Sequence, residues 1–189
     1  MIRIGILGNI GSGKSYIAKK FGYPVFNADY EVSKLYKKDK KIFKILKKKL
    51  PKHISSFPID KNEITTAILS NKTNLKKIIK VVHAEIRKKM NLFLKKNKKK
   101  KFVILDIPLL LENKINNKED ILVFVESKKK DIQIQLKKRA NLNHKLLNKF
   151  KKIQFLSSYK KKKSHFVIKN NFTKKSVTVG VKSVLDEIL

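Results

Sequence analysis

The chain carries near its N-terminus the stretch Gly8-Asn9-Ile10-Gly11-Ser12-Gly13-Lys14-Ser15, which matches G-x-x-x-x-G-K-[S/T] at every fixed position. An apolar run at residues 2–7 precedes it and is typical of a buried strand, and residues 16–21 favour a helix. Glycines between a strand and a helix let consecutive backbone N–H groups surround phosphate oxygens. The sequence therefore predicts a P-loop that binds the phosphates of a nucleotide through Gly8, Asn9, Ile10, Gly11, Ser12, Gly13, Lys14 and Ser15.

The last two residues of this stretch carry the chemistry of the motif. In a P-loop the lysine reaches the β- and γ-phosphates, and the hydroxyl that follows it binds Mg²⁺. We therefore expect Lys14 to be catalytic and Ser15 to be a metal ligand. The alternative is a glycine-rich turn before a helix, which the complete match and its flanking segments disfavour.

Length and composition limit the class of protein. The 189 residues suit one compact domain, and 41% hydrophobic residues suffice for a core. The absence of cysteine excludes disulfides and thiolate metal sites. No apolar run reaches the roughly 18 residues of a membrane span, and the first one ends without a signal-peptide cleavage site. We expect a cytoplasmic protein, a monomer, with no membrane partner.

The formal net charge of +34 favours binding to nucleic acid. Only three of the 48 basic residues are arginines, however, and abundant Lys, Asn and Ile indicate a bias toward A/T-rich codons. The lysine runs are dispersed along the chain, so we expect non-specific polyanion binding at low salt and no specific nucleic-acid partner. Arg3, Arg87 and Arg139 become candidates for positions that need a planar, bidentate donor.

Apolar runs alternate with helical patterns along the rest of the chain. Further strands are expected at 23–26, 101–106, 120–125 and 165–168, and helices within 30–97, at 129–139, from about 143 and at 177–188. Pro51 and Pro58 divide the long helical region. This alternation predicts an α/β fold, a five-stranded parallel sheet flanked by helices, with ligands bound beyond the carboxyl ends of the strands.

Two acidic residues lie just past apolar strands. Asp106 closes the strand at 101–106 in the pattern of a Walker B carboxylate, and we expect it to hold Mg²⁺ directly or through water. Asp29 follows the strand at 23–26 and is a candidate catalytic base for an attacking hydroxyl. The alternative for each is a helix N-cap, a role that for Asp29 is compatible with that of a base.

Over nearly its whole length the chain resembles the dephospho-coenzyme A kinases, which are P-loop kinases. Beyond the P-loop, the resemblance rests on Ala28-Asp29, His83-Ala84-Glu85-Ile86-Arg87, Asp106-Ile107-Pro108-Leu109-Leu110-Leu111-Glu112 and Phe166-Val167-Ile168-Lys169-Asn170. The family's lid carries an arginine before a helix with a glutamine and then a lysine, and Arg139, Gln154 and Lys160 fall at those places. The string at 106–112 is the most specific of these matches.

The resemblance implies transfer of the ATP γ-phosphoryl group to the ribose 3′-hydroxyl of dephospho-coenzyme A, with Mg²⁺ as cofactor. It implies that Asp29 activates the hydroxyl, that Arg139 stabilises the transferring group and that Asn170 belongs to the nucleotide site. The substrate-binding residues that it implies are Asp29, His83, Arg87, Asp106, Pro108 and Leu109. The alternatives are a packed core histidine at His83, a surface helix residue at Arg87 and a helix C-terminal charge at Arg139.

The resemblance also implies a division of the single P-loop kinase domain, residues 1–189. Its core would comprise about 1–29, 101–138 and 163–189, its helical acceptor-binding subdomain about 30–100 and its lid about 139–162. The chain departs from the family at Asn27, Lys61, Ala84 and Leu111, which bears on substrate affinity more than on reaction type. Two rival functions stay open: another small-molecule kinase, such as a nucleoside monophosphate kinase, and a basic nucleotide-dependent RNA-binding protein.

Overall fold

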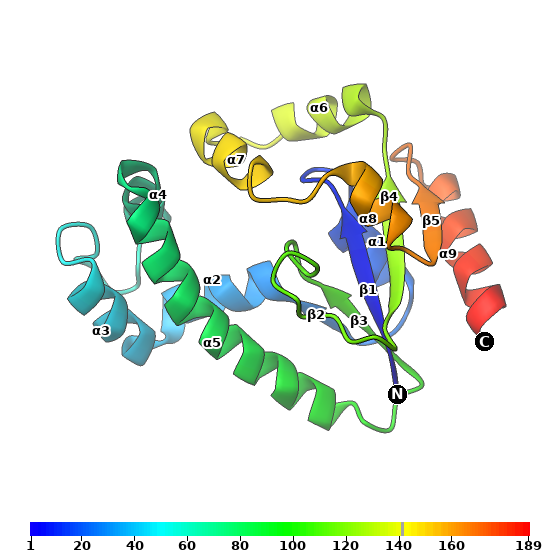
Figure 1. The fold of residues 1–189 in the computed structure, drawn as a ribbon, viewed down its shortest axis with the longest axis horizontal. Helices are drawn as coiled ribbons and strands as arrows, with labels where there is room; N and C mark the ends of the chain where they lie inside the picture. The colour runs from blue at the N-terminus through cyan, green and yellow to red at the C-terminus, as the bar shows by residue number, and fades with distance from the viewer. Residues whose placement is uncertain (141) are drawn as a thin grey trace. The chain divides into compact units, whose positions relative to one another are not determined.

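The computed structural model describes residues 1–140 and 142–189, in which strands and helices alternate (Figure 1). Contacts between residues divide the chain into two compact units. We call residues 1–27, 97–143 and 147–189 the sheet unit, and residues 28–96 and 144–146 the helical unit. In the part of the chain that is described, no helix has the length and apolar character needed to cross a membrane.

The sheet unit contains five parallel strands in the spatial order β2-β3-β1-β4-β5. Their bounds are β1 Ile2–Gly8, β2 Val25–Asn27, β3 Phe102–Asp106, β4 Ile121–Glu126 and β5 Phe166–Lys169. β3 is buried at all of its positions, as its apolar sequence requires for a strand covered on both faces. The predicted five-stranded parallel sheet is therefore confirmed, and its strands deliver the P-loop and Asp106 to the same edge.

Helices cover the two faces of this sheet. α1 (Lys14–Lys20) and α9 (Lys174–Ile188) pack on one face, where Ile17 of α1 and Val181 of α9 share a core cluster with Ile6 of β1. Figure 1 shows the short α8 (Ser157–Lys162) on the other side of β1, which it contacts. α6 (Lys129–Lys137) and α7 (His144–Lys151) contribute to a smaller apolar cluster that includes Leu136 and Leu147.

The helical unit is built from α2 (Ala28–Lys38), α3 (Lys40–Lys49), α4 (Lys61–Ser70) and α5 (Lys72–Lys96). α5 buries one apolar stripe at three- and four-residue spacing, with members at Ile78, Val82, Ile86 and Met90. Contacts join α5 to each of the other three helices. The long helical pattern expected at 30–97 thus forms four helices around one apolar face of α5.

Helix ends differ from the expected bounds for local reasons. α1 begins at Lys14, directly after the glycines, and not at residue 16. α9 begins three residues early because the Thr173 hydroxyl accepts the Ser176 N–H at 3.2 Å and caps the helix. The sequence did not predict α8, and Gln154 lies in the loop between α7 and α8 and not on a helix.

Candidate functional site

The P-loop connects β1 to α1 through backbone conformations that require glycine. Gly8 and Gly13 have φ values of 150° and 88°. A Cβ at Gly8 would lie 2.7 Å from Ser12 Oγ, and one at Gly13 would lie 2.5 Å from Asn170 Nδ2. Both residues therefore need glycine for conformation and for space, and the predicted loop is formed at the carboxyl end of β1.

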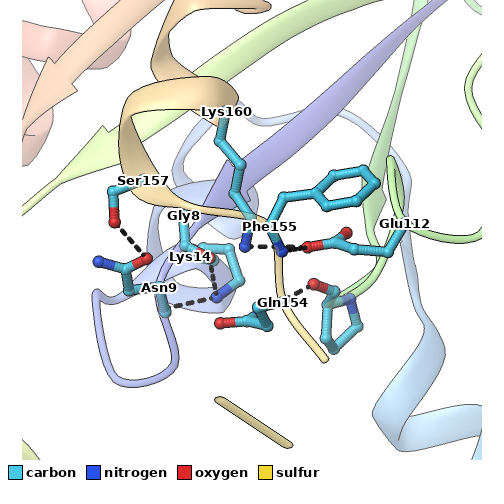
Figure 2. A network of polar contacts seen from close by, with 9 residues as sticks. Gly8, Asn9, Lys14, Glu112, Gln154, Phe155, Ser157 and Lys160 are labelled. Atoms are coloured by element: carbon cyan, nitrogen blue, oxygen red, sulfur yellow. Dashed lines mark hydrogen bonds and ion pairs between the residues drawn. The ribbon is translucent and has the colours of Figure 1, made fainter. Parts of the chain in front are cut away.

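Lys14 is the first residue of α1 and is buried against the loop that precedes it. Its ammonium donates to the carbonyl oxygens of Gly8 at 3.2 Å and of Asn9 at 2.8 Å, as Figure 2 shows. Ser15 follows it in the first turn of α1 and is exposed. The cation and the hydroxyl that the motif predicts therefore both lie at the positive end of α1.

Asp106 ends β3 beside the end of β2. Asn27 is its register partner, and the Asn27 side-chain amide donates to Asp106 Oδ2. The departure from the family at Asn27 therefore places a hydrogen-bond donor next to the Asp106 carboxylate. The residues after Asp106 form turns and not an α-helix, which excludes the capping role for Asp106. The carboxylate is 2% exposed and lies at the edge where parallel sheets bind ligands.

A pocket of about 440 Å³ lies beside the P-loop, entirely within the sheet unit. It is lined by Gly11, Gly13, Tyr16, Gln135, Lys138, Arg139, Asn170 and Phe172. Arg139 reaches it from the residues after α6, and Phe172 from the residues after β5. The Phe172 ring gives this pocket a planar group that suits a flat, aromatic ligand, and Arg139 adds a cation.

Asn170 fastens the segment after β5 to the P-loop. Its side-chain Nδ2 donates to the Ser12 carbonyl at 2.9 Å, and its Oδ1 accepts the Phe172 N–H at 2.9 Å. The side chain is almost fully buried, so both bonds are protected from water. Asn170 therefore joins the two sides of the pocket, a role consistent with its expected place in the nucleotide site.

A polar network lies next to the P-loop (Figure 2), and it joins residues that the family resemblance named without predicting their contacts. Glu112 Oε1 accepts the Phe155 N–H at 2.9 Å and lies 3.1 Å from Lys160 Nζ. Ser157 Oγ donates to Asn9 Oδ1 at 2.9 Å, which ties α8 to the P-loop. The family resemblance places Lys160 at the lysine of the lid, but composition does not separate it from the three lysines that follow, and only the fold shows that it alone is buried.

The expected string after β3 is the other anchor of this network. The Pro108 carbonyl accepts a hydrogen bond from Gln154 Nε2 at 3.2 Å. The Leu109 carbonyl accepts the Asn113 N–H at 3.0 Å within the turns that follow β3. These two backbone groups hold the segment in place, and the structure thereby connects the family string to the segment that carries Gln154.

The remaining candidates belong to the helical unit. α2 begins at Ala28, so Asp29 lies in its first turn and does not precede it as an N-cap would. His83 and Arg87 lie one turn apart on α5. Burial and the positive charge of Arg87 lower the pKa of the half-buried His83 imidazole from its ordinary value. At neutral pH His83 is therefore an uncharged hydrogen-bonding group.

The contacts of Arg3 indicate a structural role. Its Nη2 donates to Asp120 Oδ2 at 2.7 Å and to the Ile115 carbonyl at 3.0 Å. Burial raises the pKa of the Asp120 carboxyl, and the Arg3 charge opposes that rise. Both residues lie at the amino ends of β1 and β4, away from the edge that carries the P-loop. Of the three arginines, only Arg139 lines the pocket.

The residues at the P-loop edge fit a magnesium site of the P-loop kind. Among the described residues, no group of three His, Cys, Asp or Glu side chains gathers to hold a metal. Magnesium in kinase sites needs fewer protein ligands, because phosphate oxygens and water complete its shell. The Ser15 hydroxyl and the Asp106 carboxylate are donors of that type, at the ends of the motifs that predict them.

Comparisons with known proteins agree with this fold. A sequence model of the dephospho-CoA kinase family matches residues 2–175. A dephospho-CoA kinase of Wolbachia pipientis wMel is 33% identical over 190 residues, which covers 98% of this chain and 97% of the relative.

Solved structures share this fold. A Thermus thermophilus protein superposes with a TM-score of 0.78 at 26% identity, covering 100% of this chain and 98% of that chain. The dephospho-CoA kinase from Campylobacter jejuni superposes with a TM-score of 0.66 at 21% identity, covering 98% of this chain and 96% of that chain. The expected fold and the expected family resemblance are both confirmed.

Proposed function

This chain belongs to the dephospho-CoA kinase family, and we propose that it transfers the γ-phosphoryl group of ATP to the ribose 3′-hydroxyl of dephospho-coenzyme A. The observation that carries the proposal is the P-loop at the end of β1, which Asn170 fastens beside a pocket of about 440 Å³. Such a loop presents backbone N–H groups and the end of α1 to phosphate oxygens. The nature of the acceptor rests on the family.

In the proposed complex the triphosphate lies along the P-loop and the base enters the pocket beside it. Lys14 leaves the carbonyls of Gly8 and Asn9 to bind the β- and γ-phosphates. The base lies against the Phe172 ring, which lines the pocket. The segment after β5, held by Asn170, thereby fixes the distance between the base and the phosphates.

Ser15 and Asp106 would hold Mg²⁺. When bound, the metal supplies positive charge to the phosphate oxygens. The Asn27 amide donates to Asp106 Oδ2 and thereby helps to orient the carboxylate.

Transfer proceeds by attack of the acceptor oxygen on the γ-phosphorus, and the bond from that phosphorus to the bridging oxygen of ADP breaks. Asp29 takes the proton of the attacking hydroxyl. Arg139 stabilises the charge that spreads over the transferring group through its planar fork of donors. The group that leaves is ADP, so the products are ADP and coenzyme A.

The helical unit would provide the acceptor-binding subdomain, and residues 139–162 would form the lid. We assign acceptor contacts to His83 and Arg87, a neutral imidazole and a guanidinium one turn apart on α5. Pro108 and Leu109 complete the assignment from the segment after β3. A lid that excludes water favours transfer to the acceptor over hydrolysis of ATP.

The deciding experiment measures ADP release from ATP and Mg²⁺ with and without dephospho-coenzyme A. We expect the acceptor to stimulate release strongly, and product analysis to find coenzyme A. Nucleoside monophosphates and RNA serve as rival additions in the same assay. Stimulation by a monophosphate alone would establish another small-molecule kinase, and stimulation by RNA alone would establish a nucleotide-dependent RNA-binding protein. Either result would overturn the proposed acceptor.

A further inference from the structure

Lys160 is a buried lysine in a run of exposed ones. Of the four consecutive lysines at 160–163, Lys160 is 1% exposed and the other three are exposed. Burying an ammonium is costly unless its charge is paired and its N–H groups are hydrogen-bonded. A lysine retained in such a place, in a chain rich in solvated lysines, calls for a partner that uses its charge.

The structure pairs the charge of Lys160 but does not satisfy its hydrogen-bond donors. Lys160 Nζ lies 3.1 Å from Glu112 Oε1, and both side chains are almost fully buried. The ammonium nevertheless makes no hydrogen bond of acceptable geometry. The same Glu112 oxygen already accepts the Phe155 N–H at 2.9 Å. The carboxylate therefore balances the charge of Lys160 while leaving its three N–H donors without aligned acceptors.

The network around this pair leads to the P-loop. Ser157, one turn before Lys160 on α8, donates to the Asn9 side chain at 2.9 Å. The Asn9 carbonyl in turn accepts the Lys14 ammonium at 2.8 Å. Figure 2 shows Lys160 descending from α8 into this network, with Glu112 on one side and the P-loop on the other. α8 thus carries a second cation to the part of the loop where Lys14 binds.

We propose that Lys160 is a second phosphate-binding cation, held by Glu112 until ATP binds and then turned to its terminal phosphates. Phosphate oxygens offer the aligned acceptors that Glu112 does not, and they carry more negative charge. When the ammonium leaves, Glu112 keeps the Phe155 N–H as its partner, so the segment before α8 stays in place. The proposal rests on the nucleotide half of the proposed function and is independent of the acceptor.

The first test replaces Lys160 by Met, with Lys162→Met as the matched control on an exposed lysine of the same helix. Calorimetry measures the affinities for ATP and for AMP, which lacks the terminal phosphates. Lys160→Met should weaken ATP binding at least about tenfold, the loss of a charged hydrogen bond, and leave AMP binding unchanged. The control should change neither. Equal losses for ATP and AMP, or no loss in a folded variant, would overturn the proposal.

The second test removes the holding group and does not depend on how well Lys160→Met folds. Glu112→Gln keeps an oxygen for the Phe155 N–H but loses the negative charge that competes for Lys160. We expect a lower melting temperature without nucleotide, a larger upward shift on adding ATP, and ATP affinity several-fold tighter than that of the parent. A lower melting temperature with unchanged ATP affinity would show a purely structural pair. A parent protein that binds no ATP would instead defeat the proposed function itself.

Discussion

Two cation–carboxylate pairs with buried carboxylates lie at opposite ends of the sheet, and they differ in the acceptors that their cations have. At the amino ends of the strands, Arg3 donates to Asp120 at 2.7 Å and to the Ile115 carbonyl at 3.0 Å. The same carboxylate oxygen accepts the Asn117 N–H at 2.9 Å. Arg3 and Asp120 thereby tie the segment before β4 to β1.

At the other end, the Lys160 ammonium has the charge of Glu112 beside it but no aligned acceptor. Ligands of parallel sheets bind at this carboxyl end. A cation next to a buried carboxylate therefore has one of two roles in this protein, structural support or ligand binding. Arg3 Nη2 has two aligned acceptors although Arg3 Nε has none, whereas the Lys160 ammonium has no aligned acceptor and is therefore available to a ligand. Variants that separate stability from phosphate binding test this distinction.

The largest expected effect is on turnover, in Asp29→Asn. Asparagine is nearly isosteric with aspartate and fits the first turn of α2, but it cannot take the proton of the acceptor hydroxyl. Turnover should fall by about 10²–10⁴-fold, with ATP affinity and melting temperature nearly unchanged. Steady-state kinetics and calorimetry on one preparation check it.

Asp120→Asn is the matched control at the other end of the sheet. It removes the same charge from a structural pair, so it should lower stability and spare turnover per folded molecule. If Asp29→Asn keeps turnover within a few-fold of the parent, the role of Asp29 as a base must be abandoned.

The next effect is on stability, in Arg3→Met. Removing one partner of a buried pair leaves an uncompensated charge, so the free energy of unfolding should fall by about 3–5 kcal/mol. Burial already raises the pKa of Asp120, and loss of the Arg3 charge should raise that pKa further. Urea unfolding measures the loss, and an additional Asp120→Leu substitution should restore much of it. A loss of ATP affinity in the folded variant would contradict the separation of the two ends.

Arg139→Lys should have a smaller effect, on turnover more than on ATP affinity. Lysine keeps the charge but loses the bidentate fork, so we expect turnover to fall on the order of tenfold to a hundredfold. Single-turnover kinetics separate this step from nucleotide binding. Equal turnover with arginine and with lysine would show that position 139 needs only a positive charge. The scarcity of arginine would then no longer indicate a position that requires a bidentate donor.

Much of the fold follows from the sequence because it depends on local patterns. The apolar runs that form β1, β3 and β4 end at the P-loop, at Asp106 and at Glu126, and each of these ends was predicted to within about two residues. The P-loop was equally accessible, since its glycines and Lys14 are fixed by backbone geometry and phosphate chemistry. These features do not depend on contacts between segments that are distant in the sequence.

The missed features depend on contacts between distant segments. α8 has the sequence Ser-Ser-Tyr-Lys-Lys-Lys, which has no apolar periodicity, and only its packing on β1 makes it a helix. Lys160 differs from Lys161 only in what the fold places beside it, Glu112 from 48 residues earlier rather than solvent. The pocket wall at Phe172 was missed for the same reason, because its position depends on the bond from Asn170 to the P-loop.

Phe172 offers a smaller effect in which stability and binding change in opposite directions. Its φ of 64° is costly for an aromatic residue, and glycine would adopt it without strain. Phe172→Gly should therefore lose little melting temperature or gain some, while ATP affinity falls about tenfold through loss of base stacking. Tripolyphosphate, which has no base, should bind as before. Equal losses of ATP and tripolyphosphate affinity would show that Phe172 only supports the loop.

The smallest effect concerns His83. Its charged neighbour is Arg87, which repels the protonated imidazole, whereas Arg3 and Lys160 each face a carboxylate of opposite charge. Burial and Arg87 together lower the His83 pKa below its ordinary value of 6.5. The unfolded chain therefore binds the proton more readily than the folded chain does. The stability that neutral His83 contributes is complete above pH 6.5 and declines as pH falls from there toward the folded pKa.

Urea midpoints at pH 7.5 and 5.5 measure this decline, which should be shallower in His83→Gln. Arg87→Gln removes the like charge and should raise the His83 pKa, as an NMR titration of the imidazole would record. An unchanged pKa in Arg87→Gln would assign the whole shift to burial. A pH profile identical in His83→Gln would instead place the acid sensitivity in other groups, and the neutral imidazole would lose its support as an acceptor-binding group.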